Sequence, residues 1–137
     1  MQKKLKVAVL GVFTMIMSFF LISGIYDEIY VRKNGQIVNA AIVDITSTKP
    51  TSYTFRYNTT RFSNRNNSKY YNMKDSKVGD TLIFYHLSDK PYVFVPTERT
   101  WTDINIDLSI SFFFLVVGLY LLIYQFVILP KKNIKRL

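Results

Sequence analysis

The pattern of hydrophobic and polar positions is dominated by two long stretches without any charged side chain, residues 7–26 and residues 108–129. They are 20 and 22 residues long and consist mainly of aliphatic and aromatic side chains. Because an α-helix rises about 1.5 Å per residue, helices over these stretches would be roughly 30 Å and 33 Å long, which matches the hydrocarbon thickness of a bilayer. The pattern therefore predicts two transmembrane helices.

The segment between these stretches, residues 27–107, has a different pattern, because helical periodicity is absent and β-branched and aromatic residues are frequent. It predicts five or six short antiparallel strands in a small barrel or a strongly curved sheet, whose closure would remove exposed edges. The expected strands cover residues 28–32, 36–45, 52–57, 69–73, 81–87 and 92–95.

Local signals add detail to this β-rich segment. Asn34-Gly35 is a strong signal for a tight hairpin turn, because both central positions of such a turn need positive φ. A strict alternation of polar and aromatic side chains places Tyr53, Phe55 and Tyr57 on one face of a strand. We expect that face to be buried.

The charges at the two ends of the chain predict its topology. Residues 1–6 contain three lysines, residues 130–137 contain three lysines and one arginine, and neither tail contains an acid. Basic residues close to span ends mark the cytoplasmic side, so both tails should be cytoplasmic and residues 27–107 extracytoplasmic. The expected fold class is a membrane α+β protein, with two transmembrane helices flanking a small antiparallel β-barrel-like extracytoplasmic domain.

Small residues lie on one face of each expected span. Gly11 and Ser18 share a face of the first helix, and Ser111 and Gly118 share a face of the second, which would let two helix backbones approach closely. A cleaved secretory signal is the alternative for the first span, but its apolar run exceeds the usual 7–15 residues and no Ala-x-Ala-like site follows. An uncleaved anchor is favoured. Aromatic residues suited to the outer membrane interface are Tyr26, Tyr30 and Trp101.

Composition limits the chemistry that the chain can carry. It has no cysteine and a single histidine in 137 residues, which excludes disulfides, Cys-ligated metals and thiol catalysis. His86 shares an expected strand face with Leu82 and Phe84, where a packed histidine is favoured over a catalytic base, and with Asp89 it offers only two metal ligands. We expect no enzyme activity, catalytic residue, metal, cofactor or small-molecule substrate.

The chain has twice as many basic as acidic residues, 18 against 9. The formal net charge is +9, but the two tails supply most of it. Topology and contact with lipid headgroups therefore explain the balance better than nucleic-acid binding.

A polar and basic segment is the candidate binding surface. Residues 58–68 are almost wholly polar, which predicts a long hairpin loop, and no acid occurs between Asp44 and Asp75. Neighbouring aromatic side chains would supply buried anchors beside a positive field, so the functional interpretation is contact with an acidic partner or anionic lipid. A solvated loop is the alternative. The candidate residues are Arg61, Arg65, Lys69, Tyr57, Phe62, Tyr70 and Tyr71.

A series of features follows the whole chain: the first span, Gly35 before a strand, Tyr53-x-Phe55-x-Tyr57, Val78-Gly79-Asp80-x-Leu82-x-Phe84-Tyr85, Asp89-Lys90-Pro91 and the second span. In this order they resemble domain-of-unknown-function family 3592. The resemblance implies an amino-terminal span, a β-rich domain and a later span, and it supplies no established catalytic residues. A turn at Gly79-Asp80 before a buried strand is plausible independently of the family.

Together these features predict a non-enzymatic integral membrane protein, in a bacterial inner (cytoplasmic) membrane with both termini cytoplasmic. Its β-domain would bind an extracytoplasmic or membrane protein, as an accessory subunit or an immunity-type protein. An oligomeric pore or transporter subunit is the alternative, which is less favoured because the spans lack polar pore-lining residues. Asn58 and Asn66 begin N-glycosylation acceptor sequences, which matter only in a eukaryote.

Overall fold

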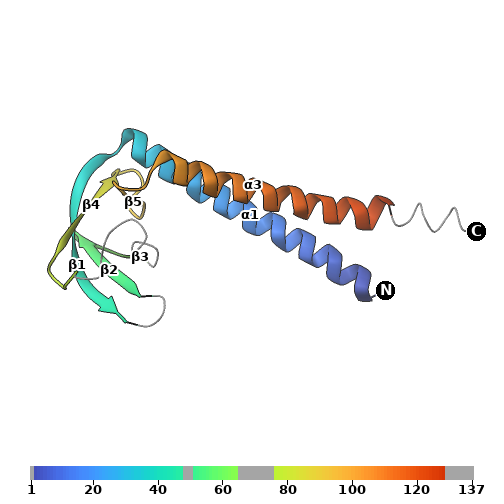
Figure 1. Ribbon diagram of the computed structural model, residues 1–137, viewed down its shortest axis with the longest axis horizontal. Coiled ribbons are helices and arrows are strands. Elements are labelled where there is room, and N and C mark those ends of the chain that lie inside the picture. The colour runs from blue at the N-terminus through green and yellow to red at the C-terminus, as the bar shows by residue number, and fades with distance from the viewer. Residues whose placement is uncertain (1, 48–50, 65–75, 129–137) are drawn as a thin grey trace, which may run out of the picture. The chain divides into compact units, whose positions relative to one another are not determined.

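The computed structural model describes residues 2–47, 51–64 and 76–128. The chain divides into two compact units. The helical unit consists of the two ends of the chain, up to Ile25 and from Ile104, and the β-unit consists of Tyr26–Asp103. Long helices and an antiparallel sheet give the α+β class that the sequence predicts (Figure 1).

Two long helices, α1 (Gln2–Asn34) and α3 (Trp101–Ile123), contain the apolar stretches, and α3 continues as a π-helical segment (Tyr124–Ile128). Both helices are long and apolar enough to cross a membrane. Each extends beyond its charge-free stretch, so the end of α1 and the start of α3 belong to the β-unit.

Between its two buried isoleucines, Ile25 and Ile104, and its far end, the helical unit has small residues inside and large apolar residues outside. Four of its buried positions hold only glycine or serine: Gly11, Ser18, Ser111 and Gly118. Phenylalanine, isoleucine, leucine and valine side chains along both helices point outward and are exposed. Since large apolar side chains gain most from leaving water, this distribution suits a hydrocarbon surrounding better than an aqueous one.

The strand expected at residues 28–32 is wrong, because α1 continues through this stretch. The Asn34-Gly35 hairpin is also wrong, because these residues end the helix. The Gly35 amide donates to the Val31 carbonyl over 2.7 Å, and a strand begins at the next residue. A Cβ at position 35 would lie 2.8 Å from the His86 carbonyl oxygen, so this close approach requires glycine.

The β-unit contains one five-stranded antiparallel sheet with the order β3-β2-β1-β4-β5. Three expected strands, at residues 36–45, 52–57 and 81–87, are confirmed, and β5 overlaps the one expected at residues 92–95. The strand expected at residues 69–73 lies outside the described residues. The strands are β1 (Gln36–Thr46), β2 (Ser52–Tyr57), β3 (Thr60–Asn64), β4 (Thr81–His86) and β5 (Phe94–Pro96).

The long hairpin loop expected at residues 58–68 is wrong in its first half, because β3 occupies that part. Only Asn58 and Thr59 connect β2 to β3, and Asn58 has a φ of 51°, in the left-handed region that asparagine tolerates. β3 pairs with β2 along its whole length. Its polar composition fits an edge strand with one face in solvent, which the sequence pattern does not distinguish from a loop.

A tight turn leads into β4, as expected. Gly79 has a φ of 100°, which glycine adopts without strain. The Gly79 amide donates to the Ile42 carbonyl and the Ile42 amide donates to the Asp80 carbonyl, each over 2.8 Å. The turn at Gly79-Asp80 is therefore confirmed, and it lies at the end of the β1–β4 ladder remote from Gly35.

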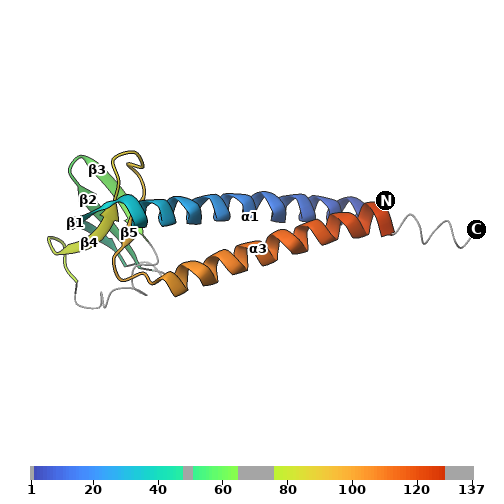
Figure 2. The same ribbon diagram turned by 90° about the horizontal axis from the view of Figure 1, so that it is seen from above.

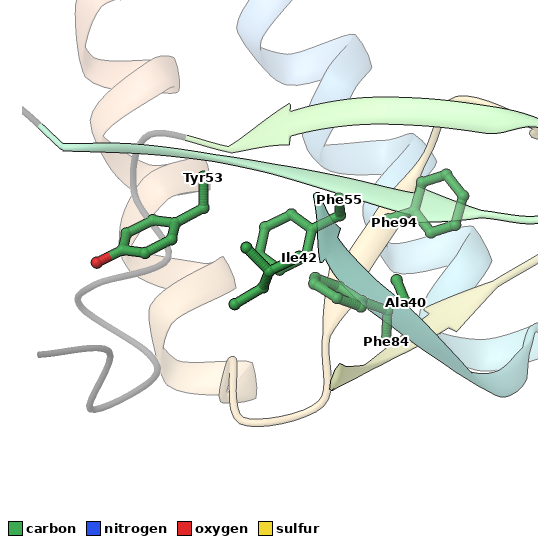
Figure 3. Packing of buried hydrophobic residues seen from close by; sticks show 6 residues of the cluster. All are labelled: Ala40, Ile42, Tyr53, Phe55, Phe84 and Phe94. Carbon is green, nitrogen blue, oxygen red and sulfur yellow. The ribbon is translucent and has the colours of Figure 1, made fainter. Parts of the chain in front are cut away.

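The core of the β-unit lies on one face of the sheet (Figure 3). Burial of Tyr53 and Phe55 is confirmed, and Tyr57 packs half-buried against the same cluster. The β1–β2 register shifts between Ile42 and Asp44, a bulge that bends β1 and increases its twist. The buried cluster consists of Ala40, Ile42, Tyr53, Phe55, Phe84 and Phe94.

The sheet curls into a half-barrel (Figure 2). β3 and β5 are its two edge strands, with three strands between them. Nevertheless, Phe62 of β3 stacks on Phe94 of β5 with ring centroids 3.8 Å apart. Of the two architectures that the sequence predicts, a small barrel and a strongly curved sheet, the structure has the second, and the two edges of the sheet meet through side chains.

Candidate functional site

The outer face of the β2–β3 hairpin carries two arginines side by side. Arg56 of β2 lies directly opposite Arg61 of β3, and both side chains are exposed. Among the described residues neither guanidinium forms an ion pair with an acid. Like charges directly opposite each other destabilise a sheet, so the hairpin keeps its local positive field at some cost in stability.

Hydroxyl groups continue this polar surface along the hairpin. Thr54 and Ser63 form the cross-strand pair two residues from the arginines, and their side-chain oxygens lie 3.2 Å apart. Guanidinium groups bind carboxylates through paired, charge-assisted hydrogen bonds. The four side chains therefore form a surface, which we call the arginine surface, with the chemistry to contact an acidic group.

Two of the aromatic residues expected at the binding surface, Tyr57 and Phe62, belong to the described part of the chain. The structure does not place them on the arginine surface. Phe62 and Tyr57 lie on the inner face of the sheet, where Phe62 stacks on Phe94 and Tyr57 makes edge contacts with His86 and Phe94. They fill the core of the β-unit, and Arg61 projects to the other face because successive residues of a strand alternate.

The remaining candidates of the basic segment lie outside the described residues: Arg65, Lys69, Tyr70 and Tyr71. The acceptor residue Asn66 also lies outside them, whereas Asn58 occupies the exposed turn of the hairpin.

The four small residues of the expected spans lie along a common seam between α1 and α3. A Cβ at Gly118 would lie 3.0 Å from the Gly11 carbonyl oxygen, so the two backbones touch at this point. From there, one step of seven residues along each antiparallel helix leads to Ser18 and Ser111, and both are buried. Each serine hydroxyl donates to the carbonyl four residues earlier over 2.8 Å, so the seam needs no hydrogen bond between helices.

The seam continues to a residue that the sequence analysis did not single out. Gln125 follows Gly118 by seven residues, is 8% exposed, and lies in the π-helical segment. Its Nε2 has no hydrogen-bond partner within the described part of the chain. The spacing of seven residues from Ser111 through Gly118 was the signal that could have found it.

The ion pair between Glu28 and Arg99 joins α1 to the segment before α3. Arg99 Nη2 lies 3.1 Å from Glu28 Oε2, and the pair is largely shielded from solvent. Arg32 donates a hydrogen bond from Nη1 to the Arg99 carbonyl, and its Cζ lies 4.6 Å from the centroid of the Trp101 ring. In the sequence Glu28 begins an expected strand, and no local pattern indicates a partner 71 residues away.

A second ion pair joins the β4–β5 loop to α1. Lys90 Nζ lies 2.8 Å from Asp27 Oδ1. The hydrogen bond from Asp27, together with its negative charge, raises the pKa of Lys90 above its ordinary value. The loop is therefore attached to the first turn of α1 that follows the charge-free stretch.

His86 is half-buried and packs against the edge of the core, on the strand face that the sequence predicts. Its ring stacks on Phe94 with centroids 4.3 Å apart, and Nδ1 lies 3.3 Å from the Val93 carbonyl oxygen. Since a carbonyl can only accept, this bond places a proton on Nδ1. In the described ranges, no three His, Asp or Glu side chains gather closely enough to hold a metal ion.

No family model matches the chain, and neither a curated protein nor a solved structure is significantly similar to it. The resemblance to domain-of-unknown-function family 3592 therefore stays a prediction.

Proposed function

We propose that the chain is an integral membrane protein with both termini in the cytoplasm, whose extracytoplasmic β-unit binds an acidic region of another envelope protein. The role is non-enzymatic, as an accessory subunit or an immunity-type protein. The observation that carries the membrane assignment is the distribution of side chains in the helical unit, with serine and glycine in the seam and large apolar residues outside. Helices in lipid associate through such small residues, because lipid provides no hydrophobic drive between them.

The proposed orientation is supported by charge. The two tails carry seven basic residues and no acid, and the cytoplasmic ends of spans are enriched in such residues. A bacterial cytoplasmic membrane is the proposed location, and the β-unit would then face the cell exterior or the periplasm.

The arginine surface supports the proposed binding role. Arg56 and Arg61 are exposed and adjacent, and their repulsion would be relieved by an acidic partner. Such a surface acts mainly on the rate of association and on the choice of partner.

Single cysteines in this cysteine-free chain test the topology. Thr59→Cys, in the hairpin turn, should react with a membrane-impermeant maleimide in intact cells, whereas Asn133→Cys should react only after permeabilisation. Labelling of Asn133→Cys in intact cells would contradict the proposed orientation.

Matched charge reversals test the binding role. Arg61→Glu and Lys77→Glu both reverse one exposed basic side chain, but only the first lies on the arginine surface. Each protein is purified from its native membranes in mild detergent, and the retained proteins are identified by mass spectrometry. We expect Arg61→Glu to lose an acidic partner that the wild type and Lys77→Glu retain. If the wild type, Arg61→Glu and Lys77→Glu all retained the same proteins, the result would contradict the proposal.

A further inference from the structure

The β4–β5 loop holds an exposed aromatic side chain at a fixed place. Tyr92 is 83% exposed, the most exposed of the large hydrophobic side chains in the described residues. The loop around it is well defined: the Lys90 amide donates to the Leu87 carbonyl and the Val93 amide donates to the Lys90 carbonyl, each over 3.0 Å. The second turn has Pro91 at its second position, where proline fixes φ, and Tyr92 at its third.

Both ends of this turn are attached to the rest of the β-unit. On one side, Lys90 forms the ion pair with Asp27 of α1 over 2.8 Å. On the other side, the Val93 carbonyl accepts a hydrogen bond from His86 at the end of β4. Tyr92 lies between these two attached residues in the chain, so its side chain is exposed on a loop that is held at both ends.

The ion pair between Lys90 and Asp27 indicates how deep the β4–β5 loop would lie relative to the membrane. Asp27 is the first charged residue after the charge-free stretch of residues 7–26, so in the proposed topology it marks the level at which α1 leaves the hydrocarbon. A lysine ammonium 2.8 Å from that carboxylate must lie at the same level. Tyr26 and Tyr30, one turn apart on α1, are also exposed there.

We propose that the β4–β5 loop contacts the outer leaflet of the membrane and places the Tyr92 ring among the lipid headgroups. This inference rests on the proposed membrane insertion. A tyrosine ring suits that layer because its apolar body can enter the acyl boundary while its hydroxyl bonds to headgroup oxygens. The charge of Lys90 is matched by Asp27, so the contact requires no anionic lipid.

Tryptophan fluorescence of the full chain in vesicles tests the contact. The chain has one tryptophan, so Trp101→Phe gives a background in which Tyr92→Trp is the only reporter. The control reporter is Val78→Trp, which is also an exposed apolar position but adjoins the Gly79 turn at the other end of the β1–β4 ladder. Both proteins are reconstituted in phosphatidylcholine with or without bromine on the acyl chains.

We expect brominated lipid to quench Tyr92→Trp and to leave Val78→Trp unchanged. Equal emission of Tyr92→Trp in the two lipids would overturn the inference, and so would equal quenching of both reporters. Adding Asp27→Asn should reduce the quenching of Tyr92→Trp, because the loop loses its attachment to α1. Undiminished quenching would overturn the role given to the ion pair.

An alkaline carbonate wash separates failure of this inference from failure of the proposed function. Protein that stays in the vesicles while Tyr92→Trp is not quenched is inserted without the loop contact. Protein that is released by the wash is not integral, which contradicts the membrane assignment itself.

Discussion

Phe62 and Phe94 stack face to face with an interplanar angle of 3°, although they belong to opposite edge strands of the sheet. His86 covers the other side of Phe94 at 4.3 Å, so three rings form one stack. Because Phe62 and Phe94 belong to the two edge strands, this stack links the two edges of the sheet.

Removing the central ring should open the half-barrel. We expect Phe94→Ala to lower the free energy of unfolding of the β-unit by about 3–5 kcal/mol, a large share of the total for a small domain. The loss should exceed that of Phe62→Ala, because Phe94 touches both neighbouring rings. Proteolysis rates in micelles measure it, with the exposed Ile37→Ala as the control. Equal rates for Phe94→Ala and Ile37→Ala would contradict the assigned core.

A bulky residue in the seam should separate the helices. The Cβ of a leucine at Gly118 would lie 2.8 Å from Met15 Cγ and 3.0 Å from the Gly11 carbonyl oxygen, whereas Gly24 has open space around it. In a Ser18→Cys/Ser111→Cys protein, mild oxidation should link the helices by a disulfide between the two buried positions. We expect Gly118→Leu to abolish the link and Gly24→Leu to preserve it. The opposite pattern would mean that the seam runs along another face.

We expect Lys90 to lose its proton at a higher pH than an ordinary lysine does. The hydrogen bond to Asp27, together with the negative charge of that carboxylate, raises the pKa of Lys90 above its ordinary value. For a lysine with a raised pKa in the folded state, the stabilisation is fully present below the unfolded pKa of about 10.4 and is lost as the pH rises through the folded pKa. ¹⁵N-lysine NMR in micelles should show a higher titration midpoint in the wild type than in Asp27→Asn. Identical midpoints would show that the ion pair does not persist in solution.

Relief of the arginine repulsion should stabilise the hairpin. We expect Arg61→Thr to raise the free energy of unfolding by roughly 0.2–1 kcal/mol, because it removes a like charge opposite Arg56 and adds a β-branched residue. Arg56→Thr should give a similar gain, and the double variant should gain less than the sum. Denaturant titration of the three proteins measures this coupling. Fully additive gains would show that the two charges do not interact.

The sequence predicts the features of the fold that depend on local periodicity. The charge-free stretches predict the two long helices, and the alternation in β2 identifies Phe55 as a core residue. Asn34-Gly35 is misleading because the same dipeptide ends helices and makes hairpins, and here it ends α1. The hydrophobic pattern does not indicate β3, because the solvent-facing side chains of this strand are polar.

The candidate site is less predictable than the fold. Arg61 could be found from charge, but its position opposite Arg56 depends on a turn of only two residues after Tyr57. The pairing of Glu28 with Arg99 joins residues 71 apart, and a single sequence contains no signal for it.

The ion pair between Glu28 and Arg99 also determines how the β-unit would respond to mechanical load. Arg99 lies in the chain between β5 and α3, so tension applied along α3 reaches this side chain before it reaches the three-residue strand. Without the ion pair, the same tension would act on the pairing of β5 with β4. With it, part of that tension would pass to α1 through the Glu28 side chain before it reached Phe94 of β5.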